Sequence, residues 1–164
     1  MPSRILIVDN EVPTLRAWAK ALRYAKHTVV TASSAEEALT ACDEHAFDLV
    51  ILDYLMPSMT GVELLTRIRK KLPLVRAIVI SGRIEERLNE KDLRDTIREA
   101  VEADLYLHKA VSNERLKAAV DELLKGSPAV DWADFASRAI QGRSSKVKAV
   151  KAVEKKLKPH LKRN

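Results

Sequence analysis

The sequence predicts an α/β fold in which five β-strands and the helices between them form an open, doubly wound parallel sheet. Five short apolar segments alternate along the chain with amphipathic segments of helical period. The segments that begin at Ile5, Leu49 and Ala77 show no alternation with polar residues, which is typical of strands covered on both faces. Right-handed crossovers place the intervening helices on both faces of such a sheet. The predicted element order is therefore (βα)₅.

Each apolar segment is short and rich in β-branched residues, as expected for a strand. The predicted strands are residues 5–8, 28–32, 49–52, 77–80 and 105–107. Apolar residues spaced three and four apart give three of the helices a core-facing stripe. These stripes are Leu15, Trp18, Ala19 and Leu22 in the first, Val62, Leu65, Ile68 and Leu72 in the third, and Leu116, Val120 and Leu123 in the fifth.

The helix starts carry recognisable caps. Ser34 followed by Glu37 three residues later predicts a capping box that opens a helix running to about His45. Ser112 is predicted to cap the fifth helix. The charged segment 84–102 predicts a long fourth helix.

A domain boundary is predicted near Gly126, because this residue tolerates positive φ and Pro128 cannot continue a helix. Residues 1–125 would form the α/β domain and residues 126–164 a basic, helical C-terminal extension. The charge is divided accordingly. From Arg138 onward ten Lys and Arg face one acidic residue, Glu154, so this end carries +9 and residues 1–137 carry −3 of the net +6.

The extension has an amphipathic pattern, and its apolar residues require a partner. They are Val147, Val150, Val153, Leu157 and Leu161, with Pro159 expected to end or kink the helix. Three interpretations stay open: packing on the same domain or on a second copy in a homodimer, contact with nucleic acid or an acidic membrane surface, and disorder. Trp132 and Phe135 are predicted to anchor the start of the extension on the domain. No helix-turn-helix with its own core fits after Pro128.

The composition indicates the cellular compartment. The single cysteine, Cys42, cannot form an intramolecular disulfide, and no segment has the apolar length of a transmembrane span. The apolar segment near the start is too short for a signal peptide. We expect a cytoplasmic protein. The four histidines lie far apart without metal-ligand spacing, which argues against a zinc site.

Reactive side chains follow the predicted strands, at the edge of a parallel sheet where ligands bind. They are Asp9 and Asn10 after the first strand, Asp53 after the third, Ser81 after the fourth and Lys109 after the fifth. An aspartate there can attack a phosphoryl group, and Mg²⁺ bound by Asp9 and Asp53 would offset the repulsion between the two anions. Lys109 could neutralise a phosphoryl oxygen, and Ser81 could donate a hydrogen bond to another.

Four segments, in this order and at these strand ends, resemble the response-regulator receiver family across about residues 4–124. They are ILIVD at 5–9, LVILDYLMP at 49–57 with Gly61 beyond it, IVISG at 78–82 and YLHK at 106–109. The resemblance implies a flavodoxin-like sheet of strand order 2-1-3-4-5, similar to that of the chemotaxis response regulator. It also implies Mg²⁺ as the cofactor and a sensor histidine kinase or histidine phosphotransfer protein as the partner.

The resemblance further implies a role for each matching residue. Asp53 would be the phosphoacceptor, Lys109 the phosphate-binding lysine and Ser81 the switch hydroxyl. Tyr106 would be the aromatic residue that moves inward with that hydroxyl, although strand aromatics are often packed permanently. The metal ligands would be Asp9, Asp53 and the backbone carbonyl of Leu55.

Three departures from the family pattern matter. Asn10 stands where a second acid is usual, so it is either a turn residue or a weaker, neutral metal ligand, and Glu11 could substitute for it. Ala110 stands where a cis proline is usual, so a trans bond is expected there. The spacing from Ser81 to Lys109 is also longer than usual, which affects the fourth helix.

The sequence thus predicts a phosphorelay signalling switch rather than an enzyme. Three other functions are alternatives to this prediction. A phosphorylation-independent scaffold would keep the fold with a weakened pocket, and a nucleic-acid-binding adaptor would act through the basic extension. A hydrolase of the haloacid-dehalogenase kind is disfavoured, because its second acid, two residues after the nucleophile, is here Leu55.

Overall fold

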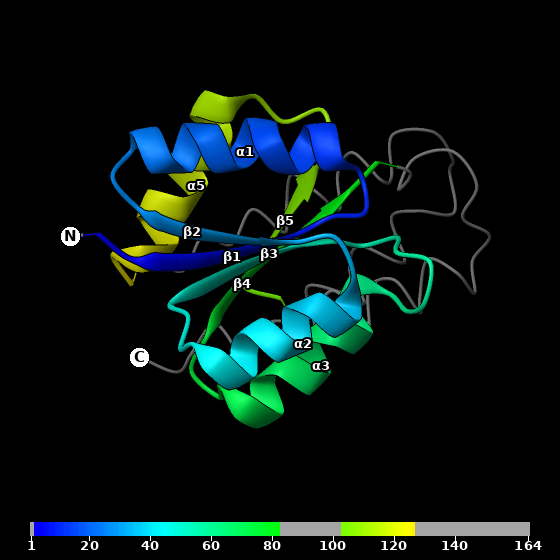
Figure 1. Cartoon of the computed structure of the whole chain (residues 1–164). Coiled ribbons are helices and arrows are strands. Elements are labelled where there is room, and N and C mark those ends of the chain that lie inside the picture. Colours follow the sequence, from blue (N-terminus) through cyan, green and yellow to red (C-terminus); the bar gives the residue numbers. More distant parts are fainter. Residues whose placement is uncertain (1, 83–102, 127–164) are drawn as a thin grey trace, which may run out of the picture.

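A computed structural model of the chain describes residues 2–82 and 103–126 (Figure 1). Within these residues the strands are β1 (Arg4–Val8), β2 (Thr28–Ala32), β3 (Leu49–Asp53), β4 (Arg76–Ser81) and β5 (Leu105–His108). The helices are α1 (Val12–Tyr24), α2 (Ala35–Glu44), α3 (Gly61–Lys71) and α5 (Asn113–Leu124). Every predicted strand is confirmed, and four of the five extend one residue beyond the predicted limits at one end or both.

The strands form one sheet of order β2-β1-β3-β4-β5, and every neighbouring pair is parallel. This confirms the flavodoxin-like topology expected from the sequence. β1 and β3 are direct neighbours, with Val8 opposite Leu52, and β4 lies between β3 and β5. The carboxyl ends of these four strands therefore meet at one edge of the sheet.

Helices cover both faces of the sheet, as the continuous apolar strands predict. In Figure 1, α1 and α5 lie on one face and α2 and α3 on the other. Alternate residues of β1 divide accordingly: Ile5 and Ile7 pack with the α1 and α5 side chains, while Leu6 and Val8 pack with those of α2 and α3. All five residues of β3 are buried. The predicted helix stripes are buried too, except that Leu72 is only partly covered beyond the end of α3.

The helix caps are partly as predicted. The Ser34 and Ser112 hydroxyls accept hydrogen bonds from the amides three residues on and begin α2 and α5. The capping box predicted at Ser34 is wrong in its second half, because the Glu37 carboxylate accepts from the Ser33 amide and hydroxyl. A complete capping box instead begins α3, formed by Thr60 and Glu63.

Gly126 follows α5 with a φ of 80°, as predicted for the residue that ends this helix. The predicted fourth helix and the basic extension, with Trp132 and Phe135, lie outside the described residues. No helix in the described part of the chain is long and apolar enough to cross a membrane.

Candidate functional site

Four strand ends deliver the predicted site residues to one edge. Asp53 ends β3 and Ser81 ends β4, whereas Asp9 and Lys109 directly follow β1 and β5. Asp53 lies opposite Ile80 in the sheet, and Ser81 lies opposite His108. The parallel register therefore places the four side-chain positions side by side.

The Lys109 ammonium group is the centre of this site. Its Nζ lies 3.0 Å from Asp9 Oδ2, 3.1 Å from Asp53 Oδ2 and 3.3 Å from Glu11 Oε2. One positive charge thus faces three carboxylates. The site has a negative surplus that suits a divalent cation.

Lys109 must cross β4 to make these contacts, because β4 separates its strand from β3. Two strand spacings are roughly 9–10 Å, which requires a long, extended side chain. Its path passes Gly82, where an added Cβ would lie 3.5 Å from Lys109 Cβ and 3.6 Å from Cδ. The Lys109 amide also donates to the Ser81 carbonyl oxygen at 2.9 Å, which fixes the start of the side chain.

Because the Asp9 and Asp53 carboxylates are buried, their ionised forms depend on the positive charge of Lys109 for stabilisation. Asp9 is 0% exposed and Asp53 is 4% exposed. Burial, followed by the nearby charge of Asp9, raises the pKa of Asp53, and the contacts with Lys109 and the Leu55 amide only partly offset this rise. Burial alone would lower the pKa of Lys109, but its hydrogen bonds and attraction to Asp9 and Asp53 raise it overall.

Backbone amides orient both aspartates. The Glu11 amide donates to Asp9 Oδ1 at 2.8 Å, and the Leu55 amide lies 3.4 Å from Asp53 Oδ1. In each case the donor is two residues beyond the aspartate, in the turn that follows the strand. Lys109 Nζ donates to the same Asp9 Oδ1 at 3.3 Å and to the other oxygen of Asp53, Oδ2, at 3.1 Å.

Gly61 allows the loop after β3 to close tightly on Asp53. A Cβ at this position would lie 2.4 Å from the Asp53 carbonyl oxygen, a distance that real Cβ atoms essentially never show. The Gly61 amide donates to the Tyr54 carbonyl oxygen at 2.8 Å, and Leu55 and Thr60 form a β-bridge across the same loop. Gly61 was noticed only as part of a motif, and the close approach that requires glycine is visible only in the structure.

The remaining predicted residues occupy different environments. Ser81 is 2% exposed at the end of β4, beside the cluster. Tyr106 is 5% exposed and packs in the core on the α2 and α3 side of the sheet. Asn10 and Leu55 are exposed in the turns after β1 and β3. The structure thus gathers Asp9, Asp53 and Lys109 tightly, while Glu11, which sequence analysis offered only as a substitute, joins them.

The loop after β5 shows how the chain accommodates Ala110. Within the described ranges no peptide bond is cis, so the bond before Ala110 is trans, as expected. Unlike proline, Ala110 has an amide hydrogen, and it donates to Nδ1 of His108 at 3.1 Å. The Val111 amide donates to the His108 carbonyl oxygen. His108 therefore closes the turn that follows Lys109, a role that sequence analysis missed.

The donor set fits Mg²⁺ better than a metal held by protein ligands alone. Mg²⁺ uses one or two carboxylates and completes its octahedron with waters, carbonyl oxygens and phosphate oxygens. Asp9 and Asp53 supply two adjacent carboxylates on neighbouring strands. Among residues 2–82 and 103–126, no three His, Cys, Asp or Glu side chains form a cluster with metal-binding geometry.

The fold and this acidic edge place the chain among the doubly wound α/β domains that bind ligands at the carboxyl ends of their strands. A family model, the response regulator receiver domain, matches residues 5–121. The chain therefore belongs to the response regulator receiver domain family. Members of this family serve two-component signalling, bind Mg²⁺ at the phosphorylation site and interact with sensor histidine kinases.

Relatives of known sequence are similar over different lengths. The transcriptional regulatory protein PhoP of alkaline phosphatase synthesis in Bacillus subtilis is 28% identical over 127 residues, which cover 77% of this chain and 50% of PhoP. The virulence sensor protein BvgS of Bordetella bronchiseptica is 47% identical over 66 residues, or 40% of this chain and 5% of BvgS. The chain thus spans half or less of these relatives.

Solved structures agree with the fold. A CheY-like receiver domain from Methanospirillum hungatei superposes with a TM-score of 0.66 at 27% identity, covering 77% of this chain and 96% of that one. The response regulator TrrA of Thermotoga maritima, solved in complex with Mg²⁺-BeF, gives a TM-score of 0.62 at 30% identity, covering 74% and 98% of the two chains.

Replacing Gly61 with alanine should displace the loop from Asp53. Because the new Cβ would overlap a backbone oxygen, we expect Gly61→Ala to lower the free energy of unfolding by about 1–3 kcal/mol in urea titrations. Gly82→Ala is the matched control, since its Cβ would make ordinary contacts. Equal stability of the two variants would contradict the close approach described above.

Replacing Asp53 with asparagine should stabilise the fold at neutral pH. The raised pKa of Asp53 means that its ionised form is less favourable in the folded chain than in the unfolded one. This cost is complete above the raised pKa and absent below the ordinary value of 3.8. We expect Asp53→Asn to raise the melting temperature by a few degrees at pH 7, with the gain shrinking as the pH falls toward 3.8. A lower melting temperature at pH 7 would show that the lysine contact outweighs burial.

Proposed function

We propose that the chain is a response regulator switched by phosphorylation of Asp53. The observation that carries this proposal is the position of Asp53, nearly buried at the sheet edge with Lys109 Nζ 3.1 Å from one carboxylate oxygen. A nucleophile in this position lies beside an ammonium group, that of Lys109, which can neutralise charge on a phosphoryl group. The family supports the same function.

The proposed reaction is a phosphoryl transfer from a histidine of a sensor kinase or phosphotransfer protein. An Asp53 carboxylate oxygen forms the new bond to phosphorus, the phosphorus–nitrogen bond breaks, and its electron pair stays with the imidazole. Mg²⁺, when bound, would offset the charge of the carboxylates and the phosphoryl oxygens. Asp9, Asp53 and the backbone carbonyl of Leu55 would hold it, joined by Asn10 or Glu11.

Lys109 would change partners during this reaction. Its ammonium group contacts Asp9, Glu11 and Asp53 before transfer. A phosphoryl group on Asp53 brings a charge of roughly −2, which competes for the same ammonium group. Lys109 would then bind a phosphoryl oxygen.

The output would start at Ser81, which lies one strand away from Asp53. Its hydroxyl would donate to a phosphoryl oxygen, and Tyr106 would respond in the core between β5 and the α3 side of the sheet. The inward, 5% exposed position of Tyr106 supports the permanently packed interpretation of this residue as much as the switching one. The downstream partner would recognise the surface around β5 and α5, in the cytoplasm.

The phosphorylation-independent scaffold is the second candidate, and Asn10 is the observation that favours it. A neutral amide replaces an acid beside Asp9, which weakens a site for a hard cation. Glu11 argues against this candidate, because its carboxylate reaches Lys109 and restores the lost charge. The nucleic-acid-binding adaptor depends on residues outside the described part of the chain.

Phosphorylation should be visible in the intact mass. With acetyl phosphate and Mg²⁺, we expect the parent chain to gain one phosphoryl group, about 80 Da by its composition, and Asp53→Asn to gain none. Glu44→Gln, at the far end of α2, is the control and should react like the parent. No gain in the folded parent would favour the scaffold.

Glu11 should contribute to Mg²⁺ binding. Because Glu11→Gln removes a carboxylate charge close to Asp9 and Lys109, we expect Mg²⁺ affinity to fall roughly tenfold, or about 1.4 kcal/mol, in calorimetric titrations. Asn10→Asp should raise the affinity, since it restores a second acid, and Glu44→Gln should leave it unchanged. If Glu11→Gln binds Mg²⁺ like the parent, Glu11 has no part in the metal site.

A further inference from the structure

A groove lies at the end of the domain opposite Asp53. It has a volume of about 450 Å³ and lies beside the amino ends of β3 and β4. The length of β3 separates it from the phosphorylation site by roughly 13 Å. Its apolar lining includes Phe47, Leu72, Leu74, Val75, Leu123 and Leu124. We call this feature the basal groove.

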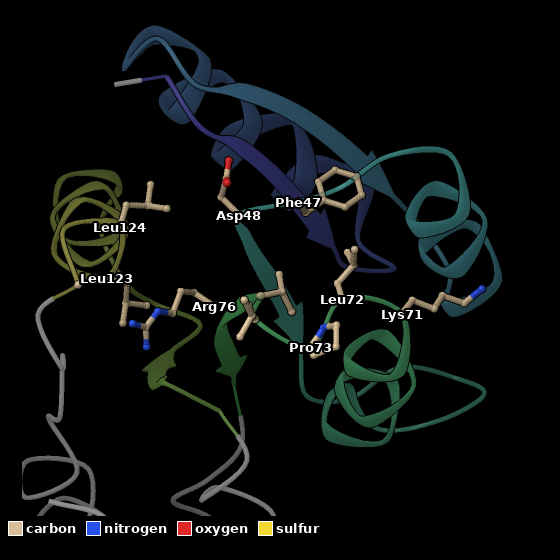
Figure 2. Close-up of a pocket in the computed structure, with 11 residues that line it drawn as sticks. Phe47, Asp48, Lys71, Leu72, Pro73, Arg76, Leu123 and Leu124 are labelled. Carbon is tan, nitrogen blue, oxygen red and sulfur yellow. The ribbon is translucent and has the colours of Figure 1, made fainter. Parts of the chain in front are cut away.

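The two walls of the basal groove come from distant parts of the chain. Figure 2 shows Leu123 and Leu124 of α5 on one side and Leu72 and Pro73, just beyond α3, on the other, with Arg76 between them. Leu74 lies in the same wall as Pro73 and is 94% exposed. Covering an exposed leucine beside an apolar groove with another apolar group lowers the free energy, because apolar surface is removed from water.

The chain itself reaches this groove. Gly126, the last described residue, is part of the lining, so residue 127 continues from its rim. Val130, Trp132 and Phe135 follow within nine residues. An extended chain covers up to roughly 20 Å in the six residues from Gly126 to Trp132, which is more than enough to turn back into the groove. A tethered segment also has a high local concentration.

The charges favour this segment over the basic part of the extension. Asp131 and Asp134 flank Trp132, whereas the Lys and Arg residues begin at position 138. The lining contains two cations and one acid, so its charges sum to +1: Arg76, paired with Asp104 at 3.0 Å, Lys71, paired with Asp43, and Asp48. An acidic, aromatic segment therefore suits a groove with apolar walls and a small positive surplus.

We propose that residues 130–135 dock into the basal groove of the same chain, with Trp132 and Phe135 covering Leu74 and Leu124. This inference does not depend on phosphorylation of Asp53. If this segment docks, the basic residues that begin at Arg138 would leave the domain at the end farthest from the phosphorylation site. It would also cover the exposed leucine without a second protein.

Acrylamide quenching of Trp132 fluorescence in the full chain tests the proposal. The only other tryptophan, Trp18, is 4% exposed and is measured alone in Trp132→Phe. We expect Trp132 of the parent to be shielded, with a quenching constant well below that of N-acetyltryptophanamide. Leu74→Asp should shift the ratio of docked to free segment about tenfold toward the free form, because one leucine contact is lost and a charge is introduced.

The control is Tyr24→Asp, which alters an equally exposed side chain outside the groove and should leave Trp132 shielded. Three results would overturn the proposal: a freely quenched Trp132 in the parent, equal shielding in Leu74→Asp, or shielding that disappears on dilution. The last result would assign the groove to a second copy of the chain. Circular dichroism checks that each variant is folded.

Discussion

The ion pairs between Lys109 and the buried carboxylates of Asp9 and Asp53 are the interaction on which the site depends. The two acids lie on neighbouring strands, and the loss of hydration raises the cost of their charges. A single ammonium group contacts both, and Glu11 adds a third carboxylate at the more exposed side. The site is therefore short of positive charge before any ligand arrives, and both Mg²⁺ binding and phosphoryl transfer would change the partners of one lysine.

This arrangement requires the whole sheet. Lys109 directly follows β5 and reaches β3 and β1 only by crossing β4, where its stem passes close to Gly82. Gly61 has a related role on the other side, since the loop after β3 touches the backbone of Asp53. Asp53 is thus held by contacts from the loops after β3 and β5, and glycines at two positions, Gly61 and Gly82, allow those contacts.

The two ends of the domain differ in chemistry. The carboxyl edge is acidic and polar, whereas the basal groove has mainly apolar walls and a lining whose charges sum to +1. α5 links them, because it follows the Lys109 loop and ends at the groove. If the segment after Gly126 docks in the groove, it would contact α5 directly. A movement of α5 would then be transmitted to the start of the extension.

The fold class, the strands and the residue types at the sheet edge could all be predicted from the sequence. Continuous apolar strands and stripes with helical spacing depend on local period and burial, and both are visible in a linear pattern. Ser34 was a correct cap from its type and position, and so was Ser112. Glu37 was wrong as the reciprocal partner, because a long carboxylate can choose between neighbouring amides and only the turn geometry decides.

The contacts between these residues, in contrast, became visible in the three-dimensional structure. Glu11 pairs with Lys109 although Asn10 stands closer to Asp9 in the sequence, because the turn after β1 directs neighbouring side chains differently. Loop geometry likewise sets two contacts, the 2.4 Å approach at Gly61 and the hydrogen bond from the Ala110 amide to His108. The basal groove forms between segments that are distant in sequence. Such contacts depend on distances between chain segments, and a linear pattern contains the residue types but not those distances.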